Sequence, residues 1–206
     1  MGKRITKVKF CGITNIEDAM YASYLGVDAI GFIFTKSKRT IEPDEAKNII
    51  SKLPPFITTV GVFMNDPFEK IKNTANHTGV NIIQLHGDES PEFCKEIEMA
   101  TGKKIIKRIR ISQETKKSEL LFAIKKYNDF HILFDPGAGD GKIFDWDLLR
   151  NFDFPYIVAG GLSPENVGEL INKIKPYAVD VSSGIEKQVG KKDFKKMEKF
   201  IKEAKG

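Results

Sequence analysis

The chain has 206 residues, of which 41% are hydrophobic, and a formal net charge of +5 at pH 7. This length fits one large α/β domain or two small ones, and no apolar run is long enough to span a membrane. The basic residues 1–9 are not followed by an apolar segment, which argues against a secretory signal. The two cysteines, Cys11 and Cys94, form neither a disulfide framework nor a metal-ligand spacing. We therefore expect a cytoplasmic protein that holds no metal.

The positive charge is concentrated near the carboxyl terminus, where residues 187–205 are rich in lysine. Such a run fits either a nucleic-acid-binding patch or a solvated helix. Apolar residues recur there at helical spacing, at Phe194, Met197, Ile201 and Ala204. The aromatic residues of this stretch follow that apolar spacing and do not form the row among basic residues that a surface for stacking bases requires. The pattern favours a helix and no nucleic-acid partner, with a small anionic substrate as the simplest use of the mild positive charge.

Short β-branched runs alternate with longer amphipathic stretches along the chain. The eight short runs are residues 8–11, 28–34, 58–63, 81–86, 104–109, 131–135, 156–160 and 178–182. Several amphipathic stretches open with a cap residue followed by proline, a common helix start: Asp66-Pro67, Ser90-Pro91 and Ser163-Pro164. Pro43 marks a further start, and the stretch after the sixth run, residues 144–151, is short.

Eight strand-like runs, each followed by a helix-like stretch, predict a closed (β/α)₈ barrel. The runs are continuously apolar, as expected for parallel strands that are covered on both faces. An open doubly wound sheet is the alternative, but it usually has fewer strands and a recognisable glycine motif. No linker or change in composition divides the chain, so we expect residues 1–206 to form one catalytic domain.

In such a barrel the reactive groups lie at the carboxyl ends of the strands. The clearest signal comes from the last two strands, which lead into glycine- and serine-containing turns. These turns contain Gly160 and Gly161, and then Ser182, Ser183 and Gly184. Glycine allows the backbone to approach a ligand, and free backbone N–H groups attract phosphate. The two turns predict a phosphate-binding site, whereas one such turn alone would suggest only a tight bend.

Asp135 ends the sixth run and precedes a glycine-rich stretch, residues 137–142. Partial burial at the barrel mouth could raise the pKa of this carboxyl enough for it to donate a proton; a helix-capping role is the alternative. Arg39 offers a planar fork suited to a carboxylate, although a single arginine in a basic cluster is more often solvated. For His86 we favour a hydrogen-bonded wall residue, and for Arg108 a substrate contact and a solvated position both remain open.

Cys11 ends the first run, directly before Gly12. A covalent nucleophile would require a histidine partner and an oxyanion hole, and a redox thiol would require a second cysteine nearby; neither is evident in the sequence. A general base requires only a lowered pKa and a carbon acid within reach. The remaining possibility is a small buried apolar residue, the role we expect for Cys94.

Several motifs together resemble the phosphoribosylanthranilate isomerase family of tryptophan biosynthesis. They are Phe10-Cys11-Gly12-Ile13-Thr14, Ser37-Lys38-Arg39, Gln84-Leu85-His86-Gly87, Phe144-Asp145-Trp146, Gly160-Gly161-Leu162 and residues 179–186. They cover almost the whole chain in the family's order. The resemblance implies a (β/α)₈ barrel that converts N-(5-phosphoribosyl)anthranilate into an open-chain ketoamine without a cofactor.

The resemblance also implies roles for individual residues. Asp135 is similar to the general acid that opens the ribose ring, and Cys11 to the general base that takes a proton from the neighbouring sugar carbon. Arg39 resembles the group that holds the anthranilate carboxylate. The turns at 160–161 and 182–184 resemble the phosphate site, and Asp180 resembles a residue that helps to position the substrate.

The expected partner is a phosphorylated small molecule, and the family occurs as monomers, as homodimers or fused to another enzyme. The stretch 137–142 departs from the family's usual glycine-rich pattern, which raises the question of whether this loop closes over substrate. Two alternatives keep the phosphate site: a related barrel enzyme of the histidine or indole-glycerol phosphate branches, and a non-catalytic phosphosugar-binding barrel. The first is disfavoured by Cys11, since the histidine-pathway isomerase carries an aspartate at the corresponding place.

Overall fold

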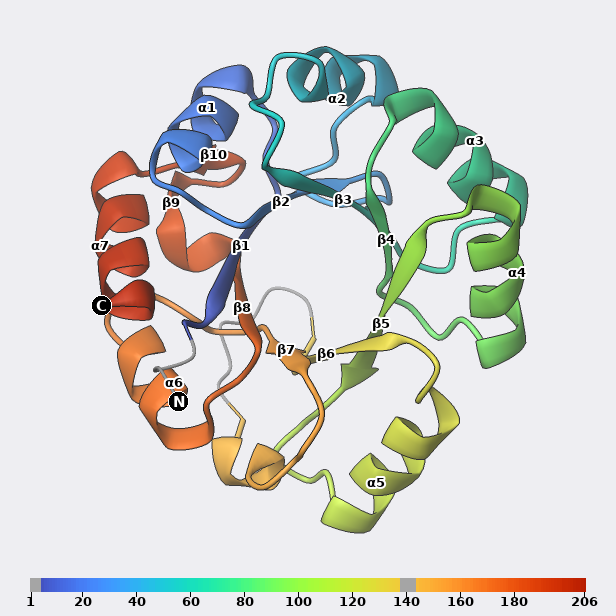
Figure 1. Ribbon diagram of the computed structural model, residues 1–206, viewed down its shortest axis with the longest axis vertical. Coiled ribbons are helices and arrows are strands. Elements are labelled where there is room, and N and C mark those ends of the chain that lie inside the picture. Colours follow the sequence, from blue (N-terminus) through green and yellow to red (C-terminus); the bar gives the residue numbers. More distant parts are fainter. Residues whose placement is uncertain (1–4, 138–143) are drawn as a thin grey trace.

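The computed structural model describes residues 5–137 and 144–206, and within these residues eight parallel strands close into a barrel. Figure 1 shows the ring of strands with helices around its outside. The strands are β1 (Lys7–Cys11), β2 (Ala29–Ile33), β3 (Thr58–Phe63), β4 (Ile82–Leu85), β5 (Lys104–Arg110), β6 (His131–Asp135), β7 (Tyr156–Val158) and β8 (Ala178–Val181). Each strand pairs with the next, and β1 closes the ring on β8. The predicted (β/α)₈ fold is confirmed.

The outer layer consists of helices that follow the strands. They are α1 (Ile16–Tyr24), α2 (Pro43–Ile50), α3 (Phe68–Thr78), α4 (Pro91–Thr101), α5 (Lys117–Lys126), α6 (Val167–Ile174) and α7 (Phe194–Lys205). After β6 the place of a helix is taken by a single 3₁₀ turn, η1 (Trp146–Leu149), which agrees with the short stretch expected there. None of the helices in the described ranges is long and apolar enough to cross a lipid bilayer.

The helix starts agree with the sequence predictions only in part. Ser90 caps α4 through a hydrogen bond from the Phe93 N–H to its hydroxyl, and Pro43 is the first residue of α2. The Ser163-Pro164 prediction is wrong, because α6 begins at Val167. The Ser163 N–H instead donates to the side chain of Asn166, whose amide donates back to the Gly161 carbonyl. These bonds fold the segment into a turn directly after β7.

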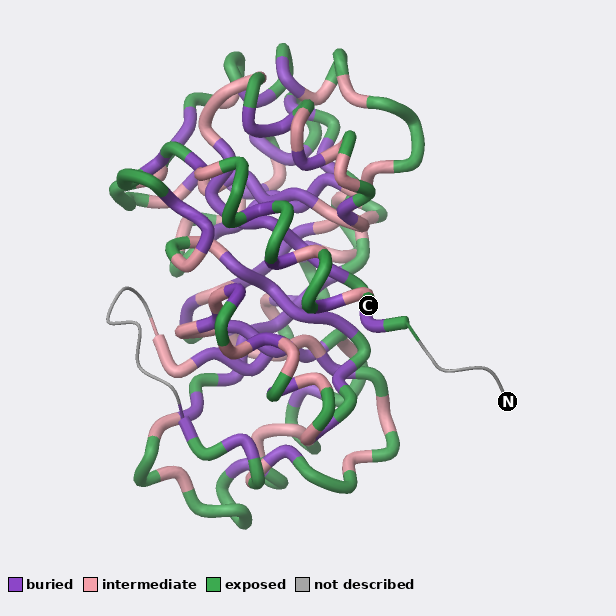
Figure 2. Tube along the Cα trace, turned by 90° about the vertical axis from the view of Figure 1, so that its left-hand side faces the viewer, coloured by how far each residue is buried: buried purple, intermediate pink, exposed green. Residues whose placement is uncertain are grey.

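The core has two parts, because alternate residues of each strand face the helices and the barrel interior. The large part lies between strands and helices, where Phe10, for example, packs edge-on against Phe200 of α7. The small part fills the barrel interior with Val60, Ile106, Leu133 and Ala159. Figure 2 shows the buried segments running through the middle of the molecule and the exposed ones along its outer loops. Above the small apolar part, the interior positions become polar.

The chain between β8 and α7 contains a hairpin that the sequence analysis did not predict. A 3₁₀ turn, η2 (Ser183–Ile185), leads into β9 (Glu186–Gln188), which pairs antiparallel with β10 (Lys191–Lys192). The hairpin brings two buried charged residues, Glu186 and Lys192, beside the carboxyl ends of β1 and β8. It therefore places ionic groups next to the barrel mouth.

Candidate active site

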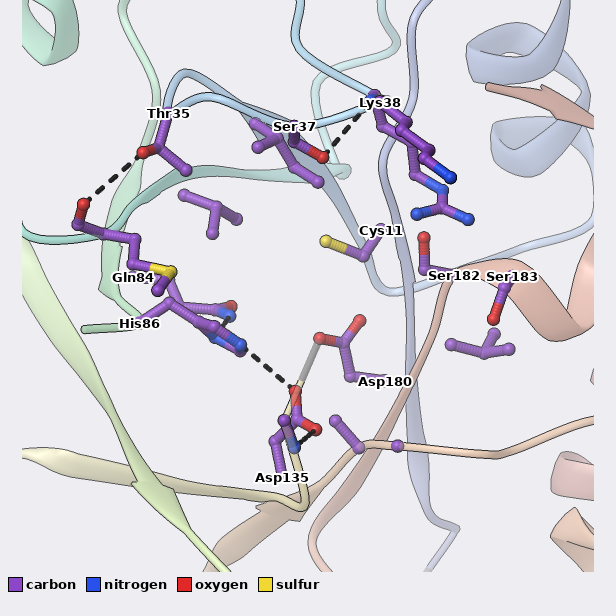
Figure 3. A pocket seen from close by; sticks show the side chains of 18 of the residues that line it. Cys11, Thr35, Ser37, Lys38, Gln84, His86, Asp135, Asp180, Ser182 and Ser183 are labelled. Atoms are coloured by element: carbon purple, nitrogen blue, oxygen red, sulfur yellow. Dashed lines mark hydrogen bonds and ion pairs between the residues drawn. The ribbon is translucent and has the colours of Figure 1, made fainter. Parts of the chain in front are cut away.

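A cavity of about 500 Å³ opens at the carboxyl ends of the strands. Its wall includes most of the residues that the sequence singled out: Cys11, Arg39, Asp135, Gly160, Gly161, Asp180, Ser182 and Ser183. Gly184 does not line it. Figure 3 shows the side chains of Cys11, Asp135 and Asp180 directed into this common space. The volume is within the range of small-molecule sites, and its location is that of active sites in (β/α)₈ barrels.

Asp135, the last residue of β6, is held by hydrogen bonds on both oxygens. Its Oδ2 lies 3.1 Å from Nε2 of His86, and its Oδ1 accepts the N–H of Gly137 at 2.9 Å. Burial alone would raise the pKa of this carboxyl. The hydrogen bond and charge of His86, the Gly137 N–H and the charge of Arg108 outweigh burial and hold the pKa below its ordinary value. The expectation of a raised pKa is therefore wrong.

His86 is fixed from two sides. The side-chain amide of Gln84, two residues earlier, lies 3.1 Å from His86 Nδ1. Arg108 of β5 donates from Nε to the His86 carbonyl at 2.6 Å, and its buried Nη1 has no hydrogen-bond partner in the described part of the chain. Arg108 is thus buried at the barrel mouth and is not a solvated surface residue. The imidazole is oriented toward Asp135, which is more than a wall position requires.

Cys11 is the last residue of β1, and only 8% of it is exposed, on the cavity side. Burial raises the pKa of its thiol, while the nearby Lys9 ammonium acts in the opposite direction. Lys9 lies on the same interior face and forms a buried ion pair with Asp180 of β8, with 2.8 Å between Nζ and Oδ2. Cys94 is fully buried on α4, and burial raises its pKa to about 11, which agrees with the packing role expected for it.

Arg39 lies in the loop after β2 and is bound by a carboxylate of the protein itself. Its Nε and Nη2 donate to the two oxygens of Glu186 at 2.7 and 2.8 Å, a bidentate pair. Lys192 completes this cluster: its Nζ contacts Glu186 at 3.1 Å and donates to the Cys11 carbonyl at 2.7 Å. The guanidinium is therefore held in place at the cavity wall, and its edge that does not face Glu186 remains for a ligand.

The turns after β7 and β8 lie against each other. Gly160 and Gly161 take the left-handed backbone conformation, with φ of 88° and 63°, which glycine adopts without strain. A Cβ on Gly184 would lie 1.9 Å from the Leu162 carbonyl oxygen, so the second turn packs directly on the first. The hydroxyl of Ser182 is buried and makes no hydrogen bond within the described residues. Backbone and hydroxyl groups thus converge at the place predicted for phosphate.

The model of the N-(5'-phosphoribosyl)anthranilate (PRA) isomerase family matches residues 8–203 of this chain. The chain belongs to this family. The isomerase of Thermotoga maritima is 45% identical over 210 residues, a match that spans 98% of this chain and all of that protein. The ordered motifs of the sequence therefore identified the family correctly.

Solved structures of PRA isomerases have the same architecture over nearly the whole chain. One contains reduced 1-(o-carboxyphenylamino)-1-deoxyribulose 5-phosphate; it is 43% identical, with a TM-score of 0.88 over 98% of this chain and all of that one. Another describes monomers generated from the dimeric T. maritima isomerase, at 41% identity and a TM-score of 0.88 with the same coverage. One solved member of the family therefore binds a phosphorylated carboxyphenylamino sugar.

Several charged residues of the site were not predicted from the sequence. Lys9 had a recognisable signal, since it is a lysine inside an apolar strand and two residues before Cys11. Glu186 ends the motif at residues 179–186, but its contact with Arg39 had no sequence signal. Lys192 had none either, because only the hairpin brings the two residues to Arg39 and Cys11. Within residues 5–137 and 144–206, no group of three or more His, Cys, Asp and Glu side chains is arranged to hold a metal ion. The altered loop stretch 138–142 lies outside the described residues.

Proposed function

We propose that this chain catalyses the Amadori rearrangement of N-(5-phosphoribosyl)anthranilate to 1-(2-carboxyphenylamino)-1-deoxyribulose 5-phosphate in tryptophan biosynthesis. The observation that carries the proposal is the presence, in one cavity, of an acid on β6 and a thiol on β1 beside two phosphate-type turns. Family membership over residues 8–203 supports the same reaction. No cofactor is required by this chemistry, because acid and base suffice.

Asp135 is the proposed general acid. Protonation of the ribose ring oxygen by its carboxyl breaks the bond from that oxygen to the sugar carbon attached to nitrogen, and the nitrogen lone pair forms the C=N bond. The product of this step is an open-chain protonated imine and the Asp135 carboxylate. His86 keeps that carboxylate directed into the cavity through its 3.1 Å contact. Such a positioned acid contributes about 10²–10⁴ in rate.

Cys11 is the proposed general base. The protonated imine acidifies the C–H bond on the next sugar carbon, so the thiolate can take this proton and become a thiol while the electrons of the C–H bond neutralise the imine. The resulting enol-amine becomes the ketoamine when the carbon attached to nitrogen takes up a proton and the hydroxyl group on the next carbon loses one. Sulfur is suited to this role because a thiolate is much less strongly hydrated than a carboxylate and Cys11 is nearly buried.

The two anionic ends of the substrate are proposed to be held on different sides of the reacting sugar. The phosphate fits the turns formed by Gly160, Gly161, Ser182 and Ser183, with Gly184 holding the two turns together. The anthranilate carboxylate fits the free edge of Arg39, and Asp180 is left to contact the sugar through Oδ1, which has no partner in the described chain. Anchoring both ends fixes the sugar between acid and base, which lowers the entropic barrier.

The experiment is a fluorescence assay with no cofactor added for the isomerase. A separate enzyme makes the substrate in the same sample from anthranilate and phosphoribosyl pyrophosphate. The wild-type protein should consume it, whereas Cys11→Ala and Asp135→Asn should each lose about 10²–10⁴ in kcat. Cys94→Ala is the matched control, a second buried cysteine outside the cavity, and should keep wild-type turnover. Near-normal turnover by both active-site variants would exclude this mechanism.

We further infer that residues 1–206 form one catalytic domain of a cytoplasmic enzyme that assembles with a second copy of itself. The contact between β1 and β8, which joins the two ends of the chain, supports a single domain. The free thiols of Cys11 and Cys94 suit a reducing compartment.

Phe56, 94% exposed, borders a hollow of about 610 Å³ at the amino ends of the strands, and this apolar feature supports a homodimer contact there.

A further inference from the structure

Lys9 is a buried ammonium group inside the barrel. Only 3% of the residue is exposed, and its Nζ lies 2.8 Å from Asp180 Oδ2 on the neighbouring strand. A buried charge is costly unless it is paired, so the ion pair with Asp180 keeps Lys9 protonated. Although burial acts to lower the Lys9 pKa, Asp180 and Cys11 together raise it above its ordinary value. Lys9 therefore keeps a positive charge inside the barrel.

This charge lies against the Cys11 thiol. Lys9 and Cys11 are two residues apart on β1, so both side chains face the interior. Across from them, Gly31 of β2 pairs with Cys11. A Cβ at Gly31 would lie 2.9 Å from Cys11 Sγ and 3.1 Å from Lys9 Nζ. Sulfur and nitrogen therefore share the space that a side chain on β2 would otherwise fill.

Other charged groups around Cys11 are already engaged with one another. Lys192 of β10 and Arg39 of the loop after β2 are both paired with Glu186. Lys192 also donates to the carbonyls of Cys11 and Ser182, and its charge favours the thiolate less than that of Lys9 does. Across the cavity, His86 and Asp135 are paired with each other. Asp180 of β8 opposes a thiolate, because it brings a second negative charge. Lys9 is thus the cation placed to favour the thiolate directly.

We propose that Lys9, held by Asp180, is the positioning residue that stabilises the Cys11 thiolate, and that Gly31 permits their contact. The inference rests on the proposed function, since it specifies how the general base is made available. The Cys11 thiol loses its proton to solvent at the cavity opening. The Lys9 ammonium then faces the resulting thiolate. Asp180 has the opposite effect on this equilibrium, so the two partners of one ion pair act on Cys11 with opposite signs.

The test measures the pH dependence of Cys11 alkylation by iodoacetamide, resolved by peptide mass spectrometry. Cys94 serves as an internal reference in the same sample, since it is fully buried and has a pKa of about 11. Lys9→Met should move the midpoint of Cys11 alkylation upward by about 1–3 pH units, the usual effect of one opposite charge at close range. Asp180→Asn removes the negative charge that opposes the thiolate and leaves Cys11 as the charge partner of the Lys9 ammonium, so the midpoint should move downward.

Two further variants guard against disturbed folding. The double variant Lys9→Met/Asp180→Asn leaves no unpaired buried charge, and its midpoint should remain above that of the wild type. Lys107→Met removes a different buried lysine, which pairs with Glu89 at 2.7 Å on the outer side of β5, and should leave the Cys11 midpoint unchanged. If Lys9 had only a structural role, Lys9→Met and Asp180→Asn would move the Cys11 alkylation midpoint in the same direction, because each breaks the same ion pair.

The inference and the proposed function fail separately in these experiments. A Lys9→Met protein whose Cys11 alkylates with the wild-type midpoint overturns the inference, even when the wild type turns over phosphoribosylanthranilate. A wild-type protein that does not turn over this substrate overturns the proposed function, even when the midpoints shift as expected.

Discussion

At the residue scale, the protein shifts the protonation equilibria of Asp135 and Cys11 in opposite directions. In the unliganded protein Asp135 has a lowered pKa and Cys11 a raised one, so the prevailing form is a carboxylate with a thiol. The proposed reactive form is a carboxylic acid with a thiolate, and it carries the same number of protons. The ratio of the two forms is therefore independent of pH between the two pKa values.

This balance predicts a specific pH profile for the unliganded enzyme. We expect kcat/KM to be flat across neutral pH, to fall in acid as Asp135 becomes protonated in the prevailing form, and to fall in alkali as Cys11 ionises. Measurement of kcat/KM between the acid and alkaline limits of stability checks it. A rate that keeps rising with pH through the Cys11 midpoint would contradict this assignment of acid and base.

A substitution at His86 should move only the acid limb of the profile, the pH range in which kcat/KM falls as the pH is lowered. His86→Asn removes the ionisable ring whose hydrogen bond and charge hold the Asp135 pKa down, so the Asp135 pKa should rise and the acid limb should shift upward by about 1 pH unit. His77→Asn is the matched control, since His77 pairs with Asp44 on the outer surface. An acid limb that stays in place in His86→Asn would show that Asp135 does not set it.

The positions of the proposed acid and base were predictable from sequence, but the directions of their pKa shifts were not. Cys11 and Asp135 each end an apolar run, and strand ends in a parallel barrel converge, which is sufficient to predict a shared site. The direction of the Asp135 shift depends on His86, Gly137 and Arg108, which approach it through the closed barrel and the following loop. The residues next to Asp135 in the sequence do not indicate how closely His86 and Arg108 approach its carboxyl group.

At the scale of elements, the phosphate-type site depends on the contact between the turns after β7 and β8. Gly184→Ala would place a methyl group where the Leu162 carbonyl lies, at 1.9 Å in the present geometry. The turns must then separate, so we expect a loss of about 1–3 kcal/mol in unfolding free energy, typical of overpacking. Inorganic phosphate should also bind more weakly, which calorimetry and denaturant unfolding would measure together.

The control for this substitution is Gly168→Ala in α6. A Cβ there would approach no atom more closely than 3.6 Å, the carboxylate oxygen of Glu203. Because alanine favours a helix over glycine, this variant should retain or gain stability. If Gly184→Ala were as stable and bound phosphate as well as Gly168→Ala, the contact between the turns would not matter for the site.

Regular elements were predictable because their signal is local, and the irregular ones were not. The eight strands and α4 follow from apolar runs and from the Ser90 cap. The start of α6 was misplaced because Asn166 competes for the backbone of the preceding turn. The β9–β10 hairpin has no apolar alternation, and it is tied to the barrel by long-range contacts, such as those of Glu186 with Arg39 and of Lys192 with the Cys11 carbonyl.

At the scale of the whole molecule, the proposed homodimer would form through the face opposite the candidate active site. Phe56→Ser should lower the molar mass measured by light scattering from that of a dimer to that of a monomer, because the exposed ring is the apolar feature bordering the hollow. Phe122→Ser, on the outside of α5, is the control: this ring is also exposed, at 73%, and its removal should not change the mass. A Phe56→Ser protein with the wild-type mass would place the contact elsewhere.

The closure of β8 on β1 has a consequence for the order in which the protein comes into being. Cys11 leaves the ribosome early, whereas the ion pair behind it joins Lys9 to Asp180, which lies 171 residues later. Glu186 and Lys192, which tie Arg39 and the Cys11 carbonyl together, are synthesised later still. A nascent chain can therefore form most of its strands while the thiol still lacks its ionic surroundings. The proposed general base is therefore surrounded by its charged neighbours only after β8 and the β9–β10 hairpin have been synthesised.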